Sequence, residues 1–294
     1  MLERRTDLAM EAAQGLQSAA RTQGVLRAET VEEGVTVTAV EIATPQAAKA
    51  LGKPKGRYVT LDLGPVRRRE AAGFQRACRI LAAELAKMLP REEGPVLVAA
   101  LGNRDITPDA VGPLAHEHLL VTRHLVDQLP EAFGSFRPVA AVAAGVLGDT
   151  GVESADLIRA VVEQVRPVCV VAIDALAAQS MKRLCTTVQL CDTGVAPGSG
   201  VGNSRAALNR ETLGVPVIAV GVPTVVDAGT LARDVLEEAG KGELEPEALG
   251  TGGLFVTPRD IDQRVAECAK LIGYAVSLAL QPGLSQEDLE GLVE

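Results

Sequence analysis

The feature that most constrains the fold is a repeated pattern of short Val- and Ala-rich runs. Each run is followed by a glycine-containing turn and then by a segment with helical spacing of apolar residues. We expect strands at residues 95–101, 138–146, 167–173 and 215–221. Because these runs are apolar on both faces, they are typical of a parallel sheet that helices cover on both sides. The pattern predicts an α/β protein in three layers, with a largely parallel, doubly wound sheet.

The longest predicted helix spans residues 65–89, and Pro65 suits its first turn. Its apolar positions recur every three or four residues, at Phe74, Cys78, Leu81, Leu85 and Met88. Two shorter strands, at residues 35–39 and 58–63, are expected to form an antiparallel edge of the sheet. Since no internal repeat or low-complexity linker interrupts the pattern, we expect one domain.

Composition excludes several classes of protein. The chain has 294 residues, of which 47% are hydrophobic, so it can bury a large core. It has no run of eighteen apolar residues, and its N-terminus is charged, which favours a cytoplasmic protein with no membrane partner. Five cysteines without CxxC spacing predict reduced thiols. A net charge of −9 with 2% aromatic residues argues against a nucleic-acid groove and favours a basic partner.

Two aspartates follow predicted strands. Asp174 ends the run VCVVAID, and Asp109 lies in the loop LGNRDITPDAVGP after residues 95–101. Ligand crevices of open α/β sheets lie beyond the carboxyl ends of the strands, so these two carboxylates are candidates for one cleft. Asp149 has a similar position, although a role in a turn fits it better. The alternative for Asp109 and Asp174 is helix capping, which aspartates in such loops often perform.

The glycine-rich segment CDTGVAPGSGVGNSR, residues 191–205, is expected to be a substrate loop, with Asp192, Gly198, Ser199 and Gly200 as candidate contacts. Its DTG triplet at Asp192 matches that of pepsin-like proteases, but those enzymes are rich in β-structure and this chain alternates strands and helices. The glycine spacing matches neither dinucleotide nor P-loop motifs. Ser199 lacks the flanking glycines of a nucleophile elbow.

The three histidines, His116, His118 and His124, cluster in what the pattern predicts to be one helix. No two of them have the i, i+4 spacing that places two imidazoles on one helix face. We therefore predict no metal site from them.

Six segments of the chain resemble the germination proteases of spore-forming Firmicutes. They are RTDLAMEA (5–12), LGNRDITPDAVGP (101–113), LLVTRHL (119–125), AIDALAAQS (172–180), DTGVAPGSGVGNSRAALN (192–209) and TLGVPVIAVGVPTVVDA (212–228). The resemblance implies an endopeptidase of the spore core that degrades small acid-soluble spore proteins and forms a homotetramer. It implies Asp109 and Asp174 as the catalytic residues, and a fold similar to that of hydrogenase maturation proteases.

Those maturation proteases hold a metal with a Glu that follows the position of Asp109, where this chain has Ala110. The difference favours chemistry without metal or cofactor, in which one ionised aspartate activates water and the other, neutral, polarises the scissile carbonyl. Two alternatives stay open. One is a metal-dependent peptidase of the maturation type, and the other is a noncatalytic module that binds a nucleotide or a basic protein.

The resemblance also implies a self-processing zymogen, cut between Asp7 and Leu8. Residues 1–7 would then be a short propeptide and residues 8–294 one protease domain. The alternative is that Asp7 caps a helix that starts at Leu8. Arg104, Arg123 and Lys182 are candidates for reading the acidic side chain that precedes the cut bond.

Overall fold

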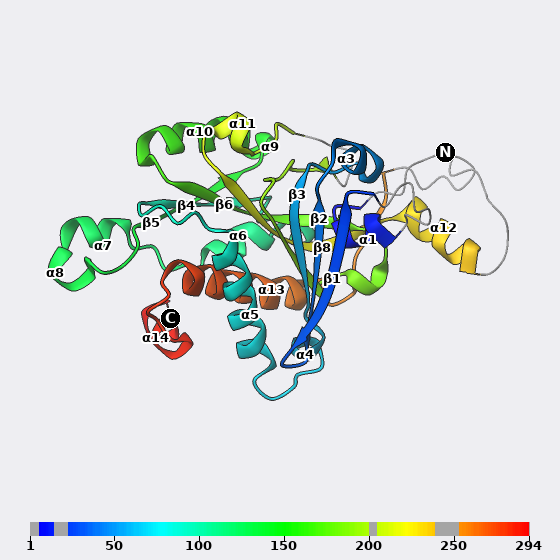
Figure 1. Cartoon of the computed structure of the whole chain (residues 1–294), viewed down its shortest axis with the longest axis horizontal. Coiled ribbons are helices and arrows are strands. Elements are labelled where there is room, and N and C mark those ends of the chain that lie inside the picture. Colours follow the sequence, from blue (N-terminus) through cyan, green and yellow to red (C-terminus); the bar gives the residue numbers. More distant parts are fainter. Residues whose placement is uncertain (1–5, 15–22, 200–204, 239–252, 294) are drawn as a thin grey trace.

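A computed structural model describes residues 6–14, 23–199, 205–238 and 253–293, and they form a mixed α/β fold around one large sheet (Figure 1). The order of the strands is β1-β2-β3-β7-β8-β6-β4-β5, with β9 paired to β8. Their bounds are β1 Val25–Glu32, β2 Val35–Ile42, β3 Gly56–Asp62, β4 Val96–Leu101, β5 Val139–Gly145, β6 Cys169–Ala178, β7 Thr187–Cys191, β8 Val217–Asp227 and β9 Phe255–Val256.

Only one half of the sheet is parallel. Strands β5, β4, β6 and β8 run parallel to one another, whereas β1, β2, β3 and β7 are antiparallel to their neighbours. The prediction of a largely parallel sheet is therefore wrong for the β1–β3 and β7 side. Residues 35–39 lie in β2 and residues 58–62 in β3, and these strands pair antiparallel as predicted. The edge of the sheet is instead β1, which was not predicted, so β2 and β3 are interior strands.

Helices cover both faces of the sheet (Figure 1). On one face lie α9 (Leu147–Thr150), α10 (Ser154–Val165) and α11 (Arg210–Leu213). On the other lie α4 (Gly64–Arg67), α5 (Gly73–Met88), α6 (Val111–His116) and α13 (Ile261–Leu280). The remaining helices are α1 Ala9–Gln14, α3 Pro45–Leu51, α7 Arg123–Gln128, α8 Pro130–Phe133, α12 Ala228–Glu238 and α14 Gln286–Val293, with 3-10 turns at Thr107–Asp109 and Met181–Arg183.

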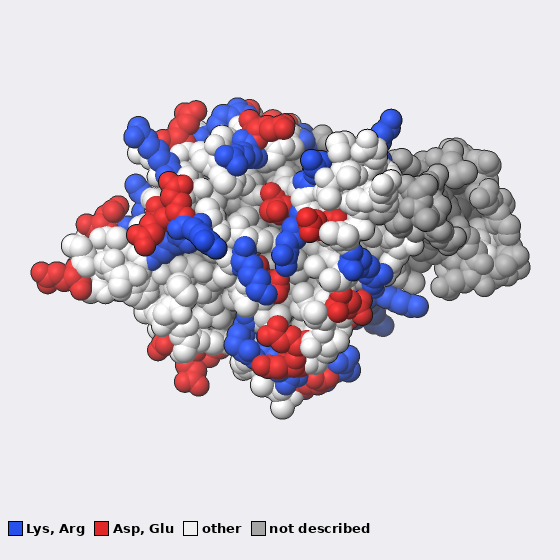
Figure 2. Space-filling model, in the orientation of Figure 1, with Lys and Arg blue, Asp and Glu red and all other residues white. Residues whose placement is uncertain are grey.

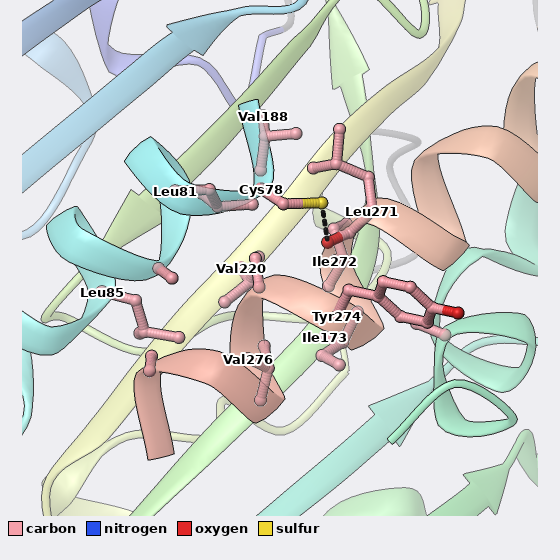
Figure 3. Close-up of a cluster of buried hydrophobic side chains, with 14 of the residues drawn as sticks. Cys78, Leu81, Leu85, Ile173, Val188, Val220, Leu271, Ile272, Tyr274 and Val276 are labelled. Atoms are coloured by element: carbon pink, nitrogen blue, oxygen red, sulfur yellow. Dashed lines mark hydrogen bonds between the residues drawn. The ribbon is translucent and has the colours of Figure 1, made fainter. Parts of the chain in front are cut away.

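The largest core cluster packs α5 and α13 against the sheet (Figure 3). The thiol of Cys78 lies inside it and donates a 3.7 Å hydrogen bond to the Leu271 carbonyl, and burial raises the pKa of that thiol. All five cysteines are buried and free, as the sequence predicted. The interior thus uses them as small apolar side chains.

The predicted helix at residues 65–89 is broken into α4 and α5. Arg69 and Ala72 adopt a left-handed backbone conformation, with φ of 53° and 55°. These residues lie between α4 and α5 and change the direction of the chain there. Gly73 then approaches the Pro65 carbonyl so closely that a Cβ would lie 2.7 Å from the oxygen. The predicted apolar stripe does face the core within α5, where Cys78, Leu81 and Leu85 are fully buried.

Acidic and basic side chains are interspersed over the face shown in Figure 2. Elsewhere in the structure, Arg67 pairs with Glu267 at 3.0 Å and Arg76 with Glu70 at 2.8 Å. In the described part of the chain, no helix combines the length and the apolar character that crossing a bilayer needs.

Candidate active site

Asp174 lies within β6, four residues before the strand ends at Ala178. The sequence predicted the strand to stop at residue 173, so the strand is longer than expected. Its pairing with β4 does stop there, at Ala100 and Ile173, because β4 is shorter. Asp174 is therefore the first residue of β6 beyond the last residue paired with β4, and its side chain is only 5% exposed.

Asp109 is held just beyond the end of β4, the neighbouring strand. The Asn103 N–H donates a 2.8 Å hydrogen bond to Asp109 Oδ2. Gly102, with φ of 109°, passes so close that a Cβ there would lie 2.0 Å from the Asp109 carbonyl oxygen. Since Asp109 binds a loop amide and Asp174 lies inside a strand, the helix-capping alternative is wrong for both residues.

Burial and mutual repulsion both act on Asp174. Burial raises the pKa of Asp174 well above its usual range, and the negative charges of Asp109 and Asp7 raise it further, against one bond from the Ala175 N–H. The pKa of Asp109 is also raised by burial, while the bond from Asn103 lowers it. The charge of Asp109 therefore favours the neutral form of Asp174, so the protonation of the two carboxyl groups is coupled.

A third polar side chain lies on the same face of the sheet as Asp174. Gly221 of β8 pairs with Asp174 on one side and with Gln189 of β7 on the other, so all three occupy one row across the sheet. Residues paired across strands point to the same face, which places Gln189 and Asp174 about 10 Å apart at Cα, or two strand spacings. Gly221 has no side chain, and Leu176 packs over it.

The N-terminal segment of the chain docks beside this row. The Asp7 N–H donates a 2.8 Å hydrogen bond to the Ala177 carbonyl, on the part of β6 that extends beyond β4. The Asp7 carboxylate accepts hydrogen bonds from the Ala177 N–H at 2.8 Å and from Ser199 Oγ at 3.1 Å. Helix α1 begins only at Ala9, so the alternative that Asp7 caps a helix starting at Leu8 is wrong.

Gln189 binds the backbone of this segment on both sides of Leu8. Its Nε2 donates to the Asp7 carbonyl oxygen at 3.0 Å, and its Oε1 accepts from the Ala9 N–H at 2.8 Å. Sequence reasoning missed this residue, because one glutamine in an unrecognised short strand gives no signal.

Glu11 provides a second anchored carboxylate four residues after Asp7. It accepts hydrogen bonds from the backbone N–H groups of Gln179 and Ser180, at 2.7 and 3.1 Å, and it is 6% exposed. Lys53 donates to the Thr6 carbonyl at 3.0 Å. Burial lowers the pKa of Lys53, while the negative charges of Asp7, Cys191 and Glu11 raise it. Sequence reasoning did not select Lys53 either.

Leu8, between the two carboxylates, is fully buried in an apolar cluster between the antiparallel half of the sheet and α3. Its buried members include Ile42, Leu51, Tyr58 and Leu184. Burying a leucine side chain in this way contributes roughly 1.5–3 kcal/mol to docking of the segment.

The residues of the candidate substrate loop make contacts at two separate positions. Ser199 contacts Asp7, whereas Asp192 accepts a 2.8 Å hydrogen bond from the Arg57 N–H at the start of β3. Gly198 takes a left-handed φ of 73° immediately before Ser199. Gly200 lies outside the described residues.

The histidines do not share one helix as predicted. His116 ends α6, His118 follows it in a turn, and His124 lies in α7, because the backbone leaves the helix between them. Across the described ranges, no three His, Cys, Asp or Glu side chains gather closely enough to hold a metal ion.

A pocket of about 270 Å³ opens beside the loop that carries Asp109. Gly102, Asn103, His116 and Asp149 are among its lining residues. Arg104 also lines it and pairs with Glu117. Arg123 begins α7, and Lys182 lies in the 3-10 turn after β6. The carboxylates of the docked segment thus contact backbone amides of β6 and the residues after it, which sequence patterns do not single out.

Comparison with known proteins identifies relatives over nearly the whole chain. A family model described as germination protease matches residues 2–242. A germination protease of Clostridium perfringens is 40% identical over 97% of each chain, and one of Caldanaerobacter subterraneus subsp. tengcongensis is 41% identical over 98% of each. A germination protease of Bacillus cytotoxicus is 46% identical over 79% of this chain and 66% of its own.

Proposed function

The chain belongs to the germination protease family, and we propose that it is the endopeptidase that initiates degradation of small acid-soluble spore proteins during germination. Membership of this family makes it a protease. The acidic chain, with its net charge of −9, suits a basic protein substrate. We place its activity in the spore core, and we propose a homotetramer that binds neither nucleic acid nor membrane.

The proposed catalytic residues are Asp109 and Asp174, acting without metal or cofactor. The ionised aspartate removes a proton from water. The water oxygen then forms a bond to the scissile carbonyl carbon as the C=O π electrons move to the carbonyl oxygen. The neutral member polarises that oxygen. As the C–N bond breaks, a proton passes to the leaving amine. The raised pKa of Asp174, to which the charge of Asp109 contributes, supports Asp174 as the neutral member of the pair.

The observation that carries this proposal is the segment docked beside Asp174. Asp7 lies within electrostatic reach of that carboxyl, and its backbone pairs with Ala177, three residues along the same strand. The segment provides an acid, a large apolar residue, an alanine and then a glutamate, at Asp7, Leu8, Ala9 and Glu11. We propose that the Asp7–Leu8 bond is its first substrate, with residues 1–7 as propeptide and residues 8–294 as one protease domain.

The second candidate is a metal-dependent peptidase of the hydrogenase-maturation type, whose fold we expect to be similar. The carboxyl groups of Asp109, just beyond the end of β4, and of Asp174, within β6, would also suit a cation. A chelator separates the two candidates. We expect EDTA to leave cleavage unchanged, and loss of activity in EDTA that a divalent ion restores would establish the metal enzyme.

The experiment that tests the proposed function is incubation of the purified chain with a small acid-soluble spore protein. Mass spectrometry would map the cut bonds, and Asp174→Asn protein provides the inactive control. We expect cuts that follow an acidic residue and precede Ile, Leu or Phe. A substrate that stays intact, with an equally intact Asp7–Leu8 bond, would refute the function.

A further inference from the structure

We propose that Gln189 is a further catalytic residue, which holds the scissile carbonyl oxygen and stabilises the negative charge that forms on it. This role rests on the proposed function, because it takes the docked Asp7–Leu8 bond as the bond that is cut. The site would then contain a neutral amide donor in addition to its two carboxyl groups.

The side-chain amide of Gln189 is placed on the reacting bond. Its Nε2 lies 3.0 Å from the Asp7 carbonyl oxygen, which belongs to the peptide bond in question. Its Oε1 binds the Ala9 N–H at 2.8 Å, two residues further along. The two ends of one side-chain amide therefore fix the backbone on either side of Leu8. This arrangement leaves the carbonyl with little freedom to rotate away.

Gln189 also has a defined position relative to Asp174. It occupies the same row and the same face of the sheet as Asp174, with Gly221 between them. A carbonyl bound to Gln189 is thus held on the face from which Asp174 projects. Gln189 is 6% exposed, so little water competes for its N–H. A hydrogen bond that is shielded from water stabilises charge more strongly than an exposed one.

The carbonyl oxygen gains charge during the reaction. Attack by water moves a pair of electrons onto this oxygen, and a donor that is already in place then faces a full negative charge. A carbonyl oxygen has two lone pairs, so it accepts from Gln189 and from a neutral aspartic acid at the same time. The bond from Gln189 should therefore strengthen along the reaction, which is the property that raises kcat.

The docked segment also suggests why a glutamine suits this position. A carboxylate there would accept from the Ala9 N–H equally well but would repel the developing oxyanion. A donor-only side chain such as lysine would lose the bond to Ala9. Glutamine has a donor and an acceptor on one rigid group, which matches a carbonyl and an N–H on one strand of substrate.

The test compares Gln189→Glu and Gln189→Met with wild-type chain. The first substitution keeps the acceptor for the Ala9 N–H and removes the donor, and the second removes both while keeping a similar length. Gln128→Glu, on the exposed last turn of α7, is the matched control for the added charge. Self-processing is followed by mass spectrometry as the appearance of a chain that starts at Leu8. Cleavage of the peptide RTDLAMEA gives kcat and KM, and thermal unfolding checks that each variant is folded.

We expect both variants to process themselves about 10²–10³-fold more slowly than wild type, the range for loss of one oxyanion donor. For Gln189→Glu, kcat for the peptide should fall. Its KM should change less than about threefold, since the acceptor for the Ala9 N–H is kept. The control Gln128→Glu should match wild type. If the wild-type chain cuts the Asp7–Leu8 bond and both folded Gln189 variants cut it at the wild-type rate, the role of Gln189 is refuted and the proposed function stands. If wild type cuts neither its own Asp7–Leu8 bond nor the peptide, both proposals fall.

Discussion

Asp7 and Ala177 are joined by two hydrogen bonds of 2.8 Å, one from the Asp7 N–H to the Ala177 carbonyl and one from the Ala177 N–H to Asp7 Oδ2. The first resembles a bond of a β-sheet, and it lies where β6 has no pairing with β4. The second uses the same residue of β6 to bind a carboxylate. One backbone position thus holds both the main chain and the acidic side chain of the segment.

The first prediction concerns the carboxylate of Asp7. In Asp7→Asn chain, only one side-chain oxygen is left to accept from the Ala177 N–H and Ser199 Oγ. A hydrogen bond to a charged group contributes about 1.5–3 kcal/mol, so self-processing should slow by roughly 10-fold or more. The rate of release of residues 1–7, measured by mass spectrometry, checks this. Asp127→Asn, at an exposed position of α7, is the control. Equal rates for the two variants would contradict carboxylate recognition here.

The second prediction concerns Glu11, whose carboxylate accepts from two backbone amides that follow each other in the chain, Gln179 and Ser180. A version of the peptide RTDLAMEA that carries the substitution Glu11→Gln presents only one acceptor oxygen to those donors. Because Glu11 lies away from the Asp7–Leu8 bond, the loss should raise KM by about 10-fold with kcat nearly unchanged, as expected when a hydrogen bond to a charged group is weakened. Steady-state kinetics of the two peptides measures it. A fall in kcat alone would show that Glu11 acts on the reacting bond instead of on binding.

The third prediction concerns the two aspartates. Asp109→Asn and Asp174→Asn each remove one carboxyl group of the proposed pair and should lower the rate of cleavage by about 10²–10⁴-fold, the range of general acid–base catalysis. Both variants should remain folded, since each carboxyl group accepts a hydrogen bond from a backbone N–H that an asparagine side-chain oxygen can also accept. Cleavage of a spore-protein substrate is the readout, with circular dichroism as the check on folding. Near-normal activity in either variant would exclude that residue as acid or base.

The strands that the sequence predicted well have continuous apolar sequences. Strands β4 and β5 were predicted to within about a residue, although only β4 is fully buried and β5 is a mostly half-buried edge strand. Asp109 and Asp174 could be selected because each follows or interrupts such a run. The residues of β1, by contrast, are mostly exposed at the edge of the sheet, so they carry no apolar signal. The strand exists because its backbone pairs with β2.

The contacts around the docked segment were beyond sequence reasoning for a different reason. The donors to Asp7 and Glu11 include backbone N–H groups of Ala177, Gln179 and Ser180, and every non-proline residue has such a group. Only the tertiary pairing of a segment near residue 7 with a strand near residue 177 selects these three. Gln189 likewise gains its significance from the register of β7 against β8, which places it in the row of Asp174.

The last prediction follows from the raised pKa of Asp174. Burial, Asp109 and Asp7 all favour its neutral form in the folded chain, whereas the unfolded chain ionises it near the ordinary value of about 3.9. Between those two pKa values the folded state binds one more proton than the unfolded state. The contribution of Asp174 to the free energy of unfolding is therefore largest below about pH 4, and it decreases as the pH rises toward the folded pKa. Asp174→Asn has no proton to lose at this position. Its urea midpoint should exceed that of wild type at about pH 8, and the difference should shrink as the pH is lowered toward about 4. Urea titrations of both proteins across this pH range test the prediction, with Asp127→Asn as control. A difference that is constant with pH would mean that the substitution acts through packing, and a difference that grows as the pH falls would mean that Asp174 is ionised in the folded protein.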